Sequence, residues 1–185
     1  SKPFGDAGGV HPIIQAEAAS RLGLILALGL IMTEPRNIQI FQELTARILD
    51  RLYREFPNPV LLDVQAIGQE VANLLESPEE EQFRVLTQDS VGAMNFLAKE
   101  GFIECRPDQR YLEQPETVFP ESVLTLKGFT LLGAVPAAVN EGIERRPIAE
   151  QLSDALNDGA RATVGELVKK LFLGALTIGS SAFVG

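Results

Sequence analysis

Two apolar runs near the ends of the chain constrain its fold more than any other feature. Leu22 to Met32 is a run of 11 residues without a charge, and Leu171 to Gly185 is a run of 15. A helix that crosses a bilayer needs about 20 apolar residues, so each run is short for an ordinary span. Burial stabilises apolar surface by about 25 cal/mol per Å², so exposure of both runs to water is costly. We therefore expect the two runs to be buried together, in one chain or across a symmetric interface.

Small residues in the second run suit close packing between helices. Gly174 and Gly179 have no side chain and let another backbone approach. Packing within the chain alone is one alternative, and contact with a membrane interface beside Lys169 and Lys170 is another. We favour a homo-oligomer or a complex with another protein. The candidate self-association residues are Leu22, Leu26, Leu171, Gly174, Ile178 and Gly179.

Residues that carry chemistry are scarce, because the chain has one His and one Cys. His11 lies in a Gly/Pro-rich segment with no second histidine to share a metal, and Cys105 lies on an expected strand, where we favour a half-buried structural thiol. Glu79, Glu80 and Glu81 fall in an expected first helical turn, where carboxylates oppose the helix dipole. No phosphate-binding glycine loop occurs. We expect no catalytic site, no cofactor and no metal, and a protein that is not an enzyme.

Composition places the chain among folded proteins. A hydrophobic content of 45% and a charged content of 22% are typical of a globular chain, and 185 residues can form a core without disulfides. A single cysteine cannot form an intramolecular disulfide. The run Leu22 to Met32 lacks the basic start and the cleavage site of a signal peptide. We therefore expect a cytoplasmic protein.

Apolar residues spaced by three and four positions predict helices in the first half of the chain. Residues 1–12 are expected to form a flexible arm and residues 13–32 an apolar helix. Apolar residues spaced three and four apart from Ile38 to Leu52 predict an amphipathic helix of about 18 residues that ends before Pro57. Asp63 is the expected N-cap of the helix that follows.

The next segments are expected to form short elements. Ser77 to Glu80 has the pattern of a capping box, Thr87 to Ser90 is expected to interrupt the helix, and a further helix is expected to end at Gly101. The pattern then predicts strands at 102–105, 110–112 and 123–126, with a turn at 106–109, and helices at 128–139, 147–158 and 163–178.

This order of helices, hairpin and helix resembles a winged helix-turn-helix domain over roughly residues 38–139. Asn95 to Ile103 resembles the end of a recognition helix entering the first wing strand, and Val123 to Leu132 resembles the last wing strand turning into a closing helix. The resemblance implies a mainly α fold with a small β-hairpin wing, in the α+β class. We expect residues 13–139 to form one domain with this core, and residues 140–185 to form a C-terminal helical extension.

The resemblance also implies where nucleic acid would bind. Recognition helices of this superfamily lie in the major groove, where exposed polar side chains read bases and basic residues hold phosphates. Carried over, the candidate contacts are Ser90, Asn95 and Lys99 on the exposed face of the helix, and Arg106 and Arg110 on the wing.

Charge disfavours this use. The chain has 16 Lys and Arg against 25 Asp and Glu, and residues 44–139 have eight against fifteen, whereas specific DNA binders make about 6 to 10 phosphate contacts. We expect the exposed face of residues 89–100 to be neutral or acidic. The best basic cluster, Arg47, Arg51 and Arg54, is interpreted as a salt-bridged helix face, because Glu43 and Asp50 precede Arg47 and Arg54 by four residues. We favour a self-associating protein-interaction module over a DNA-binding regulator, with a membrane-associated protein as the third alternative.

Overall fold

A long amphipathic helix occupies the centre of the described fold. The computed structural model describes residues 34–105, 116–134 and 146–180, with side chains described as far as Thr177. The chain divides into two units, Ser1–Pro35 and Arg36–Gly185, and all the described helices and strands belong to the second unit. The expected arm (1–12), the expected apolar helix (13–32), the turn at 106–109 and the strand at 110–112 lie outside the described residues.

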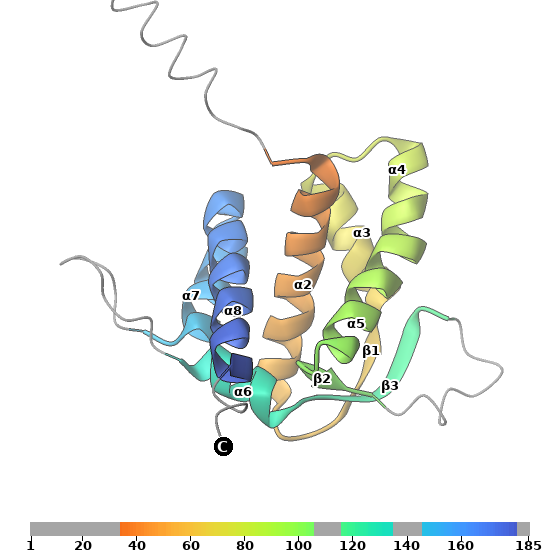
Figure 1. The fold of residues 1–185 in the computed structure, drawn as a ribbon. Helices are drawn as coiled ribbons and strands as arrows, with labels where there is room; N and C mark the ends of the chain where they lie inside the picture. Colours follow the sequence, from red (N-terminus) through yellow and green to blue (C-terminus); the bar gives the residue numbers. More distant parts are fainter. Residues whose placement is uncertain (1–33, 106–115, 135–145, 181–185) are drawn as a thin grey trace, which may run out of the picture. The chain divides into compact units, whose positions relative to one another are not determined.

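The central helix is α2 (Arg36–Glu55), which confirms the helix expected from Ile38 to Leu52. Leu44, Ile48 and Leu52 recur every four residues, and all three side chains are buried. Figure 1 shows α2 between α3 and α5 on one side and α7 and α8 on the other. α2 therefore packs against other helices of the core on two of its sides.

A short strand leads directly into the next helix. β1 (Val60–Asp63) is followed by α3 (Val64–Leu74), and the carboxylate of Asp63 accepts hydrogen bonds from the backbone amides of Gln65 and Ala66 at 3.0 and 3.3 Å. The expected N-cap is confirmed. The strand itself was not expected from the sequence.

The following helix runs without the interruption expected at Thr87 to Ser90. α4 (Glu79–Arg84), the π-helical turn η1 (Val85–Asp89) and α5 (Ser90–Lys99) form one continuous helix (Figure 1). The predicted break was wrong because the hydroxyls of Thr87 and Ser90 donate to the carbonyls of Phe83 and Leu86, four residues earlier, and so are satisfied inside the helix. Gly101, with φ of +72°, follows the helix as expected.

The predicted capping box was also wrong. α4 begins at Glu79 with Pro78 as its N-cap, and no side chain bonds to the amides of its first turn. The hydroxyl of Ser77 instead donates to the carboxylate of Glu81 at 2.9 Å. Ser77 is buried, so its hydroxyl is committed to a side-chain partner.

Three strands form a small antiparallel sheet in the order β1-β3-β2. β2 is Ile103–Glu104, and β3 is Val118–Leu124, which begins five residues earlier than expected. Val60 pairs with Ser122 and Leu62 pairs with Phe119, so β3 holds one extra residue between these pairs. Glu121 lies in this bulge with φ of +48°.

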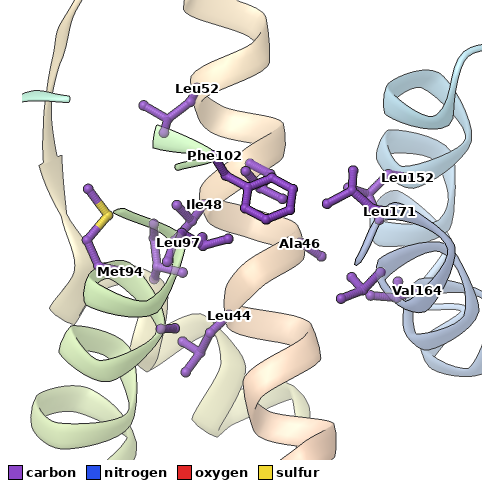
Figure 2. Close-up of a cluster of buried hydrophobic side chains, with 14 of the residues drawn as sticks. Leu44, Ala46, Ile48, Leu52, Met94, Leu97, Phe102, Leu152, Val164 and Leu171 are labelled. Carbon is purple, nitrogen blue, oxygen red and sulfur yellow. The ribbon is translucent and has the colours of Figure 1, made fainter. Parts of the chain in front are cut away.

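Three further helices complete the described chain: α6 (Leu126–Gly133), α7 (Ile148–Asn157) and α8 (Arg161–Ser180). Figure 2 shows Leu152, Val164 and Leu171 from α7 and α8 facing Ala46 of α2. Met94 and Leu97 of α5 approach the same helix from its other side (Figure 2). The expected class, mainly helical with a small sheet, is confirmed. In the described ranges, no helix is both long enough and apolar enough to cross a bilayer.

The junction from β3 to α6 depends on the Thr125 to Gly128 sequence. The Thr125 hydroxyl donates to the carbonyl of Gly101 at 2.7 Å and accepts from the amide of Gly128 at 3.1 Å, so it caps α6 and anchors it to the end of α5. A Cβ atom on Gly128 would overlap the carbonyl of Phe102. Glycine is therefore required by this close approach.

Candidate interaction surfaces

The outer face of α5 carries two of the expected nucleic-acid candidates. Asn95 and Lys99 are exposed, and neither side chain makes a hydrogen bond or ion pair with the described part of the chain. Ser90 was expected on the same face, but it is completely buried, and its hydroxyl donates a hydrogen bond to the carbonyl of Leu86. Arg106 and Arg110 lie outside the described residues.

This face has little positive charge. Among residues 89–100, Lys99 is opposed by Asp89 and Glu100, in agreement with the expected neutral or acidic character. Asp89 accepts from the guanidinium of Arg84 at 3.0 Å, a pair that spans η1. Phe83, two residues before η1, is 69% exposed, so the helix also presents an aromatic ring to solvent.

Two of the three arginines in the basic cluster of α2 are salt-bridged, as expected, whereas Arg51 makes no ion pair with a described residue. Arg54 pairs with Asp50 at 2.9 Å, and Arg47 lies 3.8 Å from Glu43. A second partner for Arg47 comes from α3, because its guanidinium donates to Glu70 at 2.9 Å. Arg47 and Arg54 are therefore already neutralised, in contrast to the phosphate-binding residues of a DNA contact.

Glu43 carries a buried carboxylate. Its side chain is almost fully buried, and its Oε2 atom has no hydrogen-bond partner within the described residues; the same holds for Nε of Arg47. Burial raises the pKa of Glu43, and the positive charges of Arg47 and Arg161 act against this rise without cancelling it. Arg161 is held in place because it donates to the carbonyl of Leu74 at the end of α3.

Glu81, at the start of α4, forms a structural contact with Arg36 of α2. Arg36 donates to Glu81 at 2.9 Å, to the Ser77 hydroxyl at 3.2 Å and to the Leu75 carbonyl at 2.8 Å, so it ties α2 to the α3–α4 connection. Partial burial raises the pKa of Glu81, but hydrogen bonds from Arg36 and Ser77 and the charges of Arg36 and Arg84 outweigh it and lower the pKa overall. Across the described ranges, no group of three or more His, Cys, Asp and Glu is arranged to hold a metal.

The outer side of α8 exposes leucine side chains. Leu173 is 63% exposed and Leu176 is 69% exposed, although neither was among the self-association residues expected from the sequence. Leu171 was expected there, but it is only 1% exposed and faces α2 beside Val164 (Figure 2). A run that is apolar on every side does not indicate which of its residues the rest of the chain covers.

The remaining self-association candidates have different outcomes. A Cβ atom on Gly174 would lie 3.1 Å from Cδ2 of Leu131, so this glycine allows α8 to pack closely against α6 of the same chain. Ile178 and Gly179 lie in α8 beyond the described side chains, and Leu22 and Leu26 lie outside the described residues. His11 also lies outside them, whereas Cys105 is partly buried against the core, as expected of a structural thiol.

A cluster of phenylalanines joins α8 to α5. The ring centroid of Phe96, on α5, lies 5.2 Å from that of Phe41 on α2 and 5.7 Å from that of Phe172 on α8. Phe96 is 40% exposed, and Leu176 follows Phe172 by one helical turn. We call Phe96, Phe172, Leu173 and Leu176 the α5–α8 apolar face. Comparisons with family models, curated proteins and solved structures returned no match to this chain.

Proposed function

We propose that this chain is a non-enzymatic interaction module of the winged-helix type, and that it self-associates through the α5–α8 apolar face. The order of elements supports the winged-helix assignment. A strand, β1, lies between the first two helices of the set, and it pairs with the second strand of the hairpin in the order β1-β3-β2. The continuous helix from Glu79 to Lys99 immediately precedes that hairpin.

The exposure of Leu173 and Leu176 is the observation that carries self-association. Both are large aliphatic side chains, more than 60% exposed, on neighbouring turns of one helix, and Phe96 and Phe172 extend the same surface. Clustered exposed apolar side chains mark interaction surfaces more often than isolated ones. The acidic charge of the chain also suits a protein partner better than a nucleic acid.

Sedimentation equilibrium of the full chain tests this proposal. We expect an oligomer at micromolar concentration, and we expect the double variant Leu173→Glu/Leu176→Glu to dissociate at least tenfold more readily, because two charges would be buried at the contact. Leu61→Glu is the matched control, since Leu61 is 62% exposed on β1. The control is expected to associate like the unmodified chain.

Three outcomes would contradict self-association through this face. A full chain that stays monomeric would do so, as would equal dissociation of the double variant and the Leu61→Glu control. The third is a monomer that floats with phosphatidylglycerol-containing liposomes and loses flotation in the double variant. That result would assign the face to a membrane interface instead.

DNA binding is the second candidate function. The observation that favours it is the pair Asn95 and Lys99 on the solvent side of α5, because an amide and an ammonium are suited to bases and phosphates. Fluorescence anisotropy with a labelled pool of duplexes at about 0.15 M salt tests it. Tight, sequence-selective binding that is weakened by Asn95→Ala and Lys99→Ala would favour a regulator over the interaction module.

A further inference from the structure

A small cavity lies where α2, α3 and the end of α7 meet. Its volume is about 120 Å³, and its polar wall includes Arg47, Arg51 and Asn157. Ile67 of α3 and Leu156 of α7 supply the smaller, apolar part of its lining, and the cavity is open to solvent on one side. A cavity of this size has room for a few waters or for one small ligand.

Some polar side chains around this cavity already have hydrogen-bond partners, and others have none among the described residues. Arg47 donates to Glu70 at 2.9 Å, and Asp50 accepts from Arg54 at 2.9 Å, so both lining carboxylates already have an arginine partner. Arg51 and Asn157 make no hydrogen bond or ion pair through their side chains with the described residues. The cavity therefore offers one guanidinium and one amide as available donors.

We propose that this cavity binds a small aliphatic carboxylate. The guanidinium of Arg51 can donate two parallel hydrogen bonds to a carboxylate, which is the geometry that this planar group favours. The amide of Asn157 supplies a further donor from α7, and a short alkyl chain fits against Ile67 and Leu156. A cation is disfavoured here, because it would compete with Arg47 and Arg54 for Glu70 and Asp50.

Nuclear magnetic resonance titration of the full chain with sodium butyrate tests the proposal. We expect saturable shifts at the amides of Ile67, Leu156 and Asn157, with a Kd on the order of 1 mM for so small a ligand. Butyramide and butylammonium share the carbon skeleton without the negative charge, and both are expected to bind at least tenfold more weakly.

Two variants test which side chains hold the carboxylate. Arg51→Gln and Asn157→Ala alter exposed side chains, so the fold is expected to persist, and Arg51→Gln is expected to weaken butyrate at least tenfold. Lys170→Gln is the matched control, because it removes one exposed positive charge on α8, and it is expected to bind butyrate normally.

Four results would overturn the proposal: no saturable butyrate shifts at these residues, equal affinity for butyramide, stronger binding of butylammonium, or unchanged butyrate affinity in Arg51→Gln. None of them bears on self-association, because the α5–α8 apolar face contains none of the cavity residues.

Discussion

Glu43 illustrates how a single side chain can reduce stability at neutral pH. Burial raises its pKa above the ordinary value of 4.5, so between the two values the folded chain binds more protons than the unfolded chain. The contribution of Glu43 therefore favours folding below the ordinary pKa, and it is lost as the pH rises through the raised pKa. The charges of Arg47 and Arg161 reduce this loss without removing it.

Replacement of this carboxylate by an amide is expected to stabilise the chain in a pH-dependent way. Glu43→Gln should raise the free energy of unfolding at neutral pH, because the neutral amide avoids the cost of burying a negative charge. The gain should vanish near pH 4.5, where the native carboxyl binds its proton. Urea unfolding at both pH values measures the difference. Glu166→Gln removes an exposed carboxylate and serves as the control, and an equal pH trend in both variants would contradict the role given to Glu43.

Predictions from the sequence succeeded for individual residues where the relevant partners are local. Asp63 was correctly expected to cap α3, because a cap needs only the two amides that follow it. Ser90 was expected at the surface, yet it is buried, because its hydroxyl bonds to the Leu86 carbonyl within the same helix. A polar side chain that bonds to the backbone of its own helix can be buried without another partner, so its residue type does not reveal whether it is buried.

At the scale of elements, α3 crosses η1 at close range. A Cβ atom on Gly68 would lie 2.9 Å from the carbonyl oxygen of Val85 and 3.0 Å from Cα of Leu86, both backbone atoms. Backbone cannot move aside as a side chain can. The π-helical turn and the glycine therefore define one tight crossing between two helices.

Gly68→Ala is expected to lower the free energy of unfolding by about 1–3 kcal/mol, because the added methyl group forces the two helices apart. Gly92→Ala is the matched control, since the equivalent Cβ on α5 would meet no atom within 4 Å. We expect that control to gain up to about 1 kcal/mol from higher helix propensity. Chemical denaturation of both variants measures the difference, and a neutral Gly68→Ala would show that the two helices cross with room to spare.

Elements with a strong internal period were predicted well, and those that depend on distant partners were not. α7 matches the expected helix at 147–158 within one residue at each end, and α2 extends two and three residues beyond the expected Ile38 to Leu52. β1 was missed because it has only four residues, the last of which is the capping Asp63, and so few residues carry no distinct alternation. Pairing with β3 makes them a strand. In the same way, Leu126 was placed in a strand, although Thr125 caps α6 immediately before it.

At the scale of the whole molecule, α8 belongs to the core of the described fold. Val164, Leu167, Val168 and Leu171 are all at most 3% exposed, and Figure 2 shows two of them facing α2. The sequence indicated that this helix needed cover, but only the packed chain distinguishes its buried side from Leu173 and Leu176. The sequence therefore indicated the segment that carries the candidate surface, but not the residues that form it.

Removal of α8 is consequently expected to unfold the chain. A chain that ends at Asp158 loses four buried aliphatic side chains and should lose its cooperative urea transition and bind a hydrophobic dye. A chain that ends at Ser180 keeps all of α8 and should retain the transition. If the shorter chain kept the same free energy of unfolding and differed only in oligomeric state, the packing of α8 against α2 would not stabilise the core.

The π-helical turn η1 also links the number of residues between α4 and α5 to the direction in which their side chains point. A π turn holds one residue more than the α-helical turn that it replaces, and each residue of an α-helix advances by about 100° around the axis. Deletion of one residue between Val85 and Asp89 would remove this extra residue and let α4 and α5 join in one regular helix with nearly the same relative orientation. If all the residues stayed and were wound as an α-helix instead, one half would rotate by about 100° relative to the other. The π turn therefore keeps the inward-facing sides of α4 and α5 in phase although the segment between them holds one residue more than a regular helix needs.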